Sequence, residues 1–164
     1  MVYIDEQIVR DIKLEGKTTK IFWDMDGTCA SMEMHLKDCK LENGFFYKKR
    51  PIRTIVNYMK KYNNMGAQTF ILSYCSFSYQ CDDKKRWLKE NCEFLKEENI
   101  IIIPRKEKSV KSSESKNTLK AEYMAEYVTP DDIVYLVDDN ESVLLGTKEK
   151  LPYINIVSPI DFVE

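Results

Sequence analysis

Two aspartates stand one residue apart in this chain, directly after a short apolar run. The run 21–23 is rich in β-formers, and Asp24 and Asp26 follow it before a Gly-Thr turn signal. Carboxylates at the end of a buried strand are costly in free energy unless a positive charge meets them. The pair therefore predicts a site that uses a cation.

A solvated turn and a calcium-binding loop are the alternatives for this Asp-x-Asp-Gly pattern. A calcium loop needs further oxygen ligands at fixed spacing and a glutamate in its twelfth position. Counting from Asp24, the twelfth residue is His35, so the calcium loop is set aside.

Three later signals carry complementary chemistry. Ser73 ends the apolar run 71–72, Lys116 begins a helix-like pattern, and Asp138 and Asp139 follow a further apolar run. In a parallel sheet the binding crevice lies at the carboxyl ends of the strands, where these side chains are expected to meet. Four converging carboxylates repel one another, and oxygen-only ligands indicate Mg²⁺ as the cation that joins them.

The ordered set Asp-x-Asp-Gly-Thr, strand-Ser, Lys and strand-Asp-Asp resembles the haloacid dehalogenase-like (HAD) superfamily of phosphotransferases, over roughly residues 20–157. The resemblance implies that Asp24 is the nucleophile at phosphorus and that Asp26 is the general acid and base. It also implies that Ser73 binds a phosphoryl oxygen. Hydrolysis would then proceed through an aspartyl-phosphate.

The same resemblance supplies the lysine and the metal ligands. Lys116 takes the catalytic place in a Lys-x-x-x-Leu-Lys helix opening, with Lys120 as the second candidate and Lys111 as a distant third. The Mg²⁺ ligands implied are Asp24, Asp26 through its backbone carbonyl, Asp139 directly, and Asp138 as a ligand or as a partner of one.

Within the superfamily, the 5'-nucleotidase (deoxyribonucleotidase-type) branch is the most similar, through residues 44–46, 69–73 and 85–88 and the Asp-Asp pair. This resemblance implies a nucleoside monophosphate or similar small phosphate ester as the substrate. Thr28, Tyr74 and Phe46 are the residues expected to contact it. The alternatives are a sugar-phosphate phosphatase or mutase, and a non-catalytic phosphate-binding protein.

Composition limits the other possibilities. The chain has 164 residues, enough for one domain with a real core, and a formal net charge of −2. This charge argues against a general nucleic-acid or membrane-surface binder, and no apolar stretch has the length of a membrane span. The five cysteines are odd in number and lack Cys-x-x-Cys spacing, which favours reduced thiols in a cytoplasmic protein.

Apolar periodicity predicts alternating strands and helices, and hence a three-layer doubly wound parallel α/β sheet in a single domain, 1–164. Residues 29–50 are expected to form a small cap insertion, with His35 as a packed or exposed cap residue. The expected helices are 5–14, 52–64, 82–97, 117–127 and 141–149, and the expected strands are 20–24, 68–73, 100–103, 133–137 and 153–157.

Overall fold

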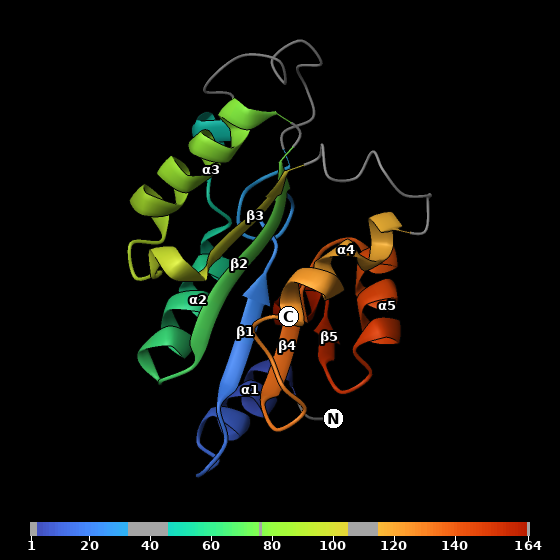
Figure 1. Cartoon of the computed structure of the whole chain (residues 1–164). Helices are drawn as coiled ribbons and strands as arrows, with labels where there is room; N and C mark the ends of the chain where they lie inside the picture. Colours follow the sequence, from blue (N-terminus) through green and yellow to red (C-terminus); the bar gives the residue numbers. More distant parts are fainter. Residues whose placement is uncertain (1–2, 33–45, 76, 105–114, 164) are drawn as a thin grey trace.

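A five-stranded sheet forms the centre of the molecule in the computed structural model, which describes residues 3–32, 46–75, 77–104 and 115–163 (Figure 1). Its strands are β1 (Thr19–Trp23), β2 (Gln68–Cys75), β3 (Ile100–Pro104), β4 (Ile133–Val137) and β5 (Asn155–Val157). They lie in the order β3-β2-β1-β4-β5, and every neighbouring pair among these strands is parallel. The doubly wound parallel sheet predicted from the sequence is confirmed.

Helices cover both faces of this sheet and complete three layers (Figure 1). The elements α1 (Ile4–Ile12), α2 (Arg53–Asn64) and α3 (Ser78–Asn91) contribute to one hydrophobic core, and α4 (Ser115–Met124) and α5 (Glu141–Lys150) contribute to the other. Successive side chains of a strand point to opposite faces, so Trp23 joins the first core and Phe22 the second. No helix in the described part of the chain has both the length and the apolar character needed to cross a membrane.

Helix α3 differs most from the sequence prediction. The helix spans residues 78–91 instead of 82–97, and a disulfide joins Cys75, the last residue of β2, to Cys81 in the first turn of α3. The Cα atoms of this pair are 5.7 Å apart, within the usual range for a disulfide. The prediction that all the cysteines are reduced thiols is therefore wrong for this pair. The first turn of α3 lies beside the end of β2 and so brings the two residues together, which their spacing in the sequence did not reveal.

Cys29 and Cys92 are free and buried, whereas Cys39 lies outside the described residues. Desolvation by burial raises the pKa of the Cys92 thiol to about 12, so this side chain stays protonated and packs as a small apolar group.

The predicted cap insertion, residues 29–50, is described at its two ends only. These ends run side by side, because Ala30 forms a bridge with Pro51 in antiparallel orientation. The intervening residues 33–45, which include His35, lie outside the described part, so the cap remains a prediction.

Candidate active site

One cavity, of about 210 Å³, lies at the carboxyl ends of β1, β2 and β4. Because β1 lies between β2 and β4, the strand order reverses at this edge, where ligands bind in open α/β sheets. Six residues predicted for the site line the cavity together: Asp24, Asp26, Ser73, Tyr74, Asp138 and Asp139. The remaining lining residues are Met32, Lys120, Asn140 and Val143.

The turn after β1 fixes the backbone beside Asp24. The Asp24 amide donates to the Val137 carbonyl of β4 at 2.9 Å, which extends the pairing of the two strands. The Met25 carbonyl then accepts hydrogen bonds from the amides of residues 28, 29 and 30. Gly27 has a φ of +78°, which glycine adopts readily and other residues rarely do. The turn therefore holds Asp24 and Asp26 in the mouth of the cavity.

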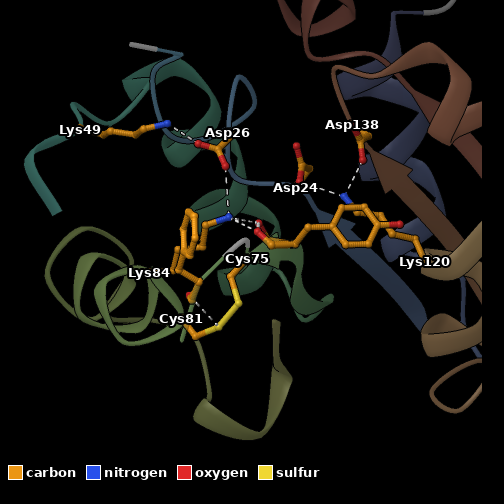
Figure 2. Close-up of polar contacts among 11 residues, drawn as sticks. Asp24, Asp26, Lys49, Cys75, Cys81, Lys84, Lys120 and Asp138 are labelled. Carbon is orange, nitrogen blue, oxygen red and sulfur yellow. Dashed lines mark hydrogen bonds and ion pairs between the residues drawn. A yellow bond between two sulfur atoms is a disulfide. The ribbon is translucent and has the colours of Figure 1, made fainter. Parts of the chain in front are cut away.

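A buried lysine from α4 pairs with two of the carboxylates (Figure 2). Lys120 Nζ donates to Asp24 Oδ1 at 2.9 Å and to Asp138 Oδ2 at 2.7 Å. Only 1% of Lys120 is exposed. Burial alone would lower the pKa of Lys120, but the negative charges of Asp24 and Asp138 outweigh it and raise the pKa. The ammonium therefore stays charged beside the predicted nucleophile.

Lys120, the second candidate from the sequence, thus occupies the place beside Asp24 that the resemblance gave to Lys116. Lys120 is the lysine that the described structure places beside Asp24, and the preference for Lys116 as the catalytic lysine stays a prediction because the side chain of Lys116 lies outside the described residues. Residues one helical turn apart share a face, so a Lys-x-x-x-Leu-Lys pattern does not itself say which lysine reaches the site.

The carboxylate cluster has the chemistry of a divalent-cation site. Asp24, Asp138 and Asp139 each offer an oxygen, and these oxygens lie within 4.8 Å of one another. Burial, together with the charges of Asp24 and Asp138, raises the pKa of Asp139 to about 7. A hard cation such as Mg²⁺ would remove this repulsion, so the donor set fits the predicted metal.

Within this cluster Asp138 already has protein partners on both oxygens. Oδ2 accepts from Lys120, and Oδ1 accepts from the Asn140 amide at 2.9 Å. Asp24 and Asp139 are therefore the better candidates for direct ligation, and Asp138 holds Lys120 in place beside Asp24.

Asp26 faces away from this cluster, toward two lysines (Figure 2). Lys49 Nζ donates to its Oδ1, and Lys84 Nζ lies 3.1 Å from its Oδ2. Burial acts to raise the pKa of Asp26, but the charges of Lys84 and Lys49 outweigh it and hold the pKa below its ordinary value. The carboxylate of Asp26 is thus directed to ammonium groups, and any metal contact would fall to its backbone carbonyl.

The sequence analysis missed both of these lysines. Lys84 lies within an Asp-Asp-Lys-Lys stretch that has the composition of a solvated helix face, yet only 2% of it is exposed. Trp87 and Leu88, three and four residues later, are buried on the same face of α3. A charged residue in helical register with an apolar stripe was the signal that could have identified Lys84.

Of the three predicted substrate contacts, only Tyr74 lines the cavity. Phe46, in the 3₁₀ turn η2 (Phe46–Lys48), is 3% exposed and packs edge-on against Trp87. Its ring also lies 4.8 Å from Lys49 Nζ and 4.9 Å from Lys84 Nζ, so its faces are occupied inside the protein.

Thr28 is fully buried as well, and its Oγ1 has no hydrogen-bond partner among the described residues. The expectation that Phe46 and Thr28 contact substrate is therefore corrected by their positions. Burial raises the pKa of Tyr74 to about 12, so its phenol remains a neutral donor in the cavity wall.

Comparison with solved structures identifies the architecture. A chain in the structure of the Pnkp1/Rnl/Hen1 complex is 15% identical, with 88% of this chain and 47% of that chain covered, at a TM-score of 0.65. The structure of the Pnkp1/Rnl/Hen1 RNA repair complex matches at 15% identity and a TM-score of 0.63, with 88% and 43% covered. This chain therefore spans less than half the length of these two neighbours.

The HAD domain of effector protein Lem4 from Legionella pneumophila is 17% identical, with 88% of each chain covered and a TM-score of 0.51. The sequence matched no protein-family model and no curated protein. At these identities a structural likeness establishes the fold and leaves the nucleotidase branch without support. The chain has the fold of the haloacid dehalogenase-like domains.

Proposed function

We propose that this protein is a Mg²⁺-dependent phosphomonoester hydrolase that acts through an aspartyl-phosphate on a nucleoside monophosphate or a similar small phosphate ester. The observation that carries the proposal is the convergence in one cavity of Asp24, Asp26, Ser73, Lys120 and the Asp138–Asp139 pair. These side chains come from segments that lie far apart in the sequence, and each has a distinct use in phosphoryl transfer.

In the first step, an Asp24 oxygen attacks phosphorus and the bond from phosphorus to the ester oxygen breaks. Ser73 donates a hydrogen bond to a phosphoryl oxygen, and Lys120 neutralises charge beside Asp24 Oδ1 as the transition state forms. The leaving alkoxide takes its proton from Asp26, which acts as a general acid.

In the second step, the Asp26 carboxylate removes a proton from water, and this water attacks the phosphorus of the aspartyl-phosphate. The bond to Asp24 breaks, inorganic phosphate leaves and the nucleophile is restored. Two displacements replace one difficult displacement, which is the advantage of covalent catalysis. Lys84 and Lys49 favour the ionised form of Asp26, which suits its role as a base in this second step. Before the first step, the negative charge of the arriving phosphate dianion opposes the two lysines and favours the protonated form that the acid role needs.

Asp24 and Asp139 would hold Mg²⁺, with a backbone carbonyl and water completing its shell. When bound, the ion would screen the substrate phosphate from the nucleophile and orient it.

The cavity argues for a small substrate. Its volume of about 210 Å³ is below the roughly 300–1,000 Å³ of pockets that enclose drug-sized ligands. The phosphoryl group would therefore occupy the cavity, with Tyr74 and Met32 beside it, while the leaving group extends toward the mouth. This arrangement tolerates nucleoside and sugar monophosphates alike.

The test is phosphate release from a panel of nucleoside and sugar monophosphates. We expect activity with Mg²⁺ and its loss in excess chelator, because the acidic cluster needs a cation to accept a phosphate dianion. Full activity in excess chelator would contradict the metal-dependent mechanism. An oligoribonucleotide with a terminal phosphate belongs in the panel, because two structural neighbours come from an RNA repair complex. Preferential turnover of this oligoribonucleotide would replace the proposed substrate class.

Gly27→Ala is expected to lower turnover by ~10²-fold, the scale of a misplacement of about 1 Å in an active site. A Cβ on Gly27 would lie 2.3 Å from Asp139 Oδ2 and 2.8 Å from its Cγ, so Asp139 must move away from the metal site. Titration with Mg²⁺ should show weaker Mg²⁺ binding in this variant, as a higher concentration of Mg²⁺ at half-maximal activity.

Gly16→Ala is the matched control for this substitution. Gly16 has a similar φ of +76°, but a Cβ there meets nothing within 4 Å. Both variants thus carry the same backbone strain, and only Gly27→Ala crowds Asp139. Equal losses of activity in the two variants would show that strain, and not the displacement of Asp139, is responsible.

A further inference from the structure

Lys84 connects the two sides of the candidate site through its polar contacts (Figure 2). Its ammonium donates to Ser73 Oγ at 2.8 Å, to Asp26 Oδ2 at 3.1 Å and to the Tyr74 carbonyl. A lysine ammonium has three donors, so these three acceptors use all of them. Ser73, Asp26 and Tyr74 line the cavity, whereas Lys84 itself does not.

We infer that Lys84 is the positioning residue that prepares the Ser73 hydroxyl to bind the transferred phosphoryl group. This inference rests on the proposed function, in which Ser73 donates to a phosphoryl oxygen. Lys84 acts through Ser73 and has no contact with the cavity of its own.

The hydrogen-bond directions around Ser73 support this role. Ser73 Oγ accepts from Lys84, so one of its lone pairs is occupied and its own proton is left to donate. Among the described residues, that proton reaches only toward the Tyr74 carbonyl, at 3.5 Å, beyond the usual 2.5–3.0 Å of an O–H···O hydrogen bond. The same carbonyl already accepts from Lys84. A phosphoryl oxygen in the cavity is thus a better acceptor than any the protein offers Ser73 in its described part.

Several contacts fix the Lys84 ammonium in this place. The Phe46 ring lies 4.9 Å from Nζ, and a cation over an aromatic face is stabilised electrostatically. The Cys75–Cys81 disulfide joins the strand that carries Ser73 to the helix that carries Lys84, one turn before Lys84. Lys84 and Ser73 therefore belong to segments that are held together covalently and by packing, as a preorganised donor requires.

Lys84→Met tests the inference, because methionine keeps much of the volume of the side chain and removes its three donors. Lys85→Met is the matched control, since Lys85 is the adjacent residue of α3 and is exposed. We expect Lys84→Met to lower kcat/KM by ~10²-fold, the scale of one preorganised electrostatic contact. Inorganic phosphate should inhibit Lys84→Met correspondingly less well, and Lys85→Met should match the unaltered protein in both measurements. Thermal unfolding identifies any loss of folded protein, in which case Lys84→Gln, which retains a donor, replaces Lys84→Met.

The role of Lys84 through Ser73 is separated from a merely structural one by a double-mutant cycle with Ser73→Ala. If Lys84 acts through Ser73, the double variant loses about as much activity as the more damaged single variant. Losses that multiply instead would overturn the inference. The transferred phosphoryl group is common to all substrates, so Lys84→Met should slow an alkyl and a nitrophenyl phosphate equally. A larger loss for the alkyl ester would assign Lys84 to Asp26 and overturn the role through Ser73.

Failure of the proposed function gives a different result. The unaltered protein would then release no phosphate from any ester, whatever residue occupies position 84. Calorimetry with inorganic phosphate in the presence of Mg²⁺ measures phosphate binding at the Ser73 site and does not require turnover. Weaker phosphate binding by both Lys84→Met and Ser73→Ala would uphold the inference in that case, and unchanged binding, or none by any of the proteins, would overturn it.

Discussion

Asp24→Asn is expected to abolish phosphate release, with a loss of at least ~10⁴-fold, because an amide is a poor nucleophile at phosphorus and catalytic nucleophiles carry effects of this size. The folded protein should persist. The substitution would remove one negative charge from a crowded acidic cluster, and Lys120 would keep its contact with Asp138. Thermal unfolding and a phosphate-release assay on the same samples measure the two effects separately.

Asp131→Asn is a suitable control for this loss, because Asp131 is an exposed aspartate that does not line the cavity. Rapid acid quenching followed by intact-mass measurement should detect phosphate on the unaltered protein and on Asp131→Asn, but not on Asp24→Asn. A phosphoenzyme that forms on Asp24→Asn would place the nucleophile elsewhere and remove the central step of the mechanism.

Lys120→Met is expected to impair both turnover and stability. The substitution leaves two buried carboxylates, Asp24 and Asp138, without the ammonium that pairs with them. Breaking a buried ion pair from one side costs about 3–5 kcal/mol of folding free energy. Turnover should fall by at least ~10²-fold in the protein that remains folded, because a preorganised charge beside the transition state is lost. Denaturant unfolding and kcat, corrected for the folded fraction, are the measurements.

Mg²⁺ provides a further check on Lys120→Met. A divalent cation between the carboxylates would replace part of the lost charge, so added Mg²⁺ should recover stability more than activity. Lys116→Ala is the control, since it removes an equal charge one helical turn earlier in α4. If Lys116→Ala loses activity while Lys120→Met stays active, Lys116 is the catalytic lysine, as the sequence predicts.

The sequence by itself determined the fold class and the strand-end residues of the site. Apolar runs at 21–23 and 134–137 have the composition of buried parallel strands, and each ends in aspartates. Since the carboxyl ends of parallel strands meet at one edge, the convergence of Asp24, Ser73 and Asp139 follows from local pattern and topology.

The positions of the side chains that helices and loops bring to the site were determined only by the tertiary structure. Lys116 and Lys120 are four residues apart in the sequence, and only the packing of α4 on the sheet brings Lys120 to within 2.9 Å of Asp24. Phe46 has an aromatic ring of the kind that stacks on a base, but packing against Trp87 places this ring inside the protein.

The ion pairs of Asp26 with Lys49 and Lys84, and the Cys75–Cys81 disulfide, depend on tertiary contacts between separate segments of the chain. Lys84 reaches Asp26 and Ser73 because α3 begins at residue 78 and packs its apolar stripe on the sheet. The same early start brings Cys81 to Cys75. Strand ends are positioned by backbone pairing, which the local sequence encodes. The face that a helix turns to the sheet and the packing of a loop depend instead on how the apolar surface of the whole domain is buried.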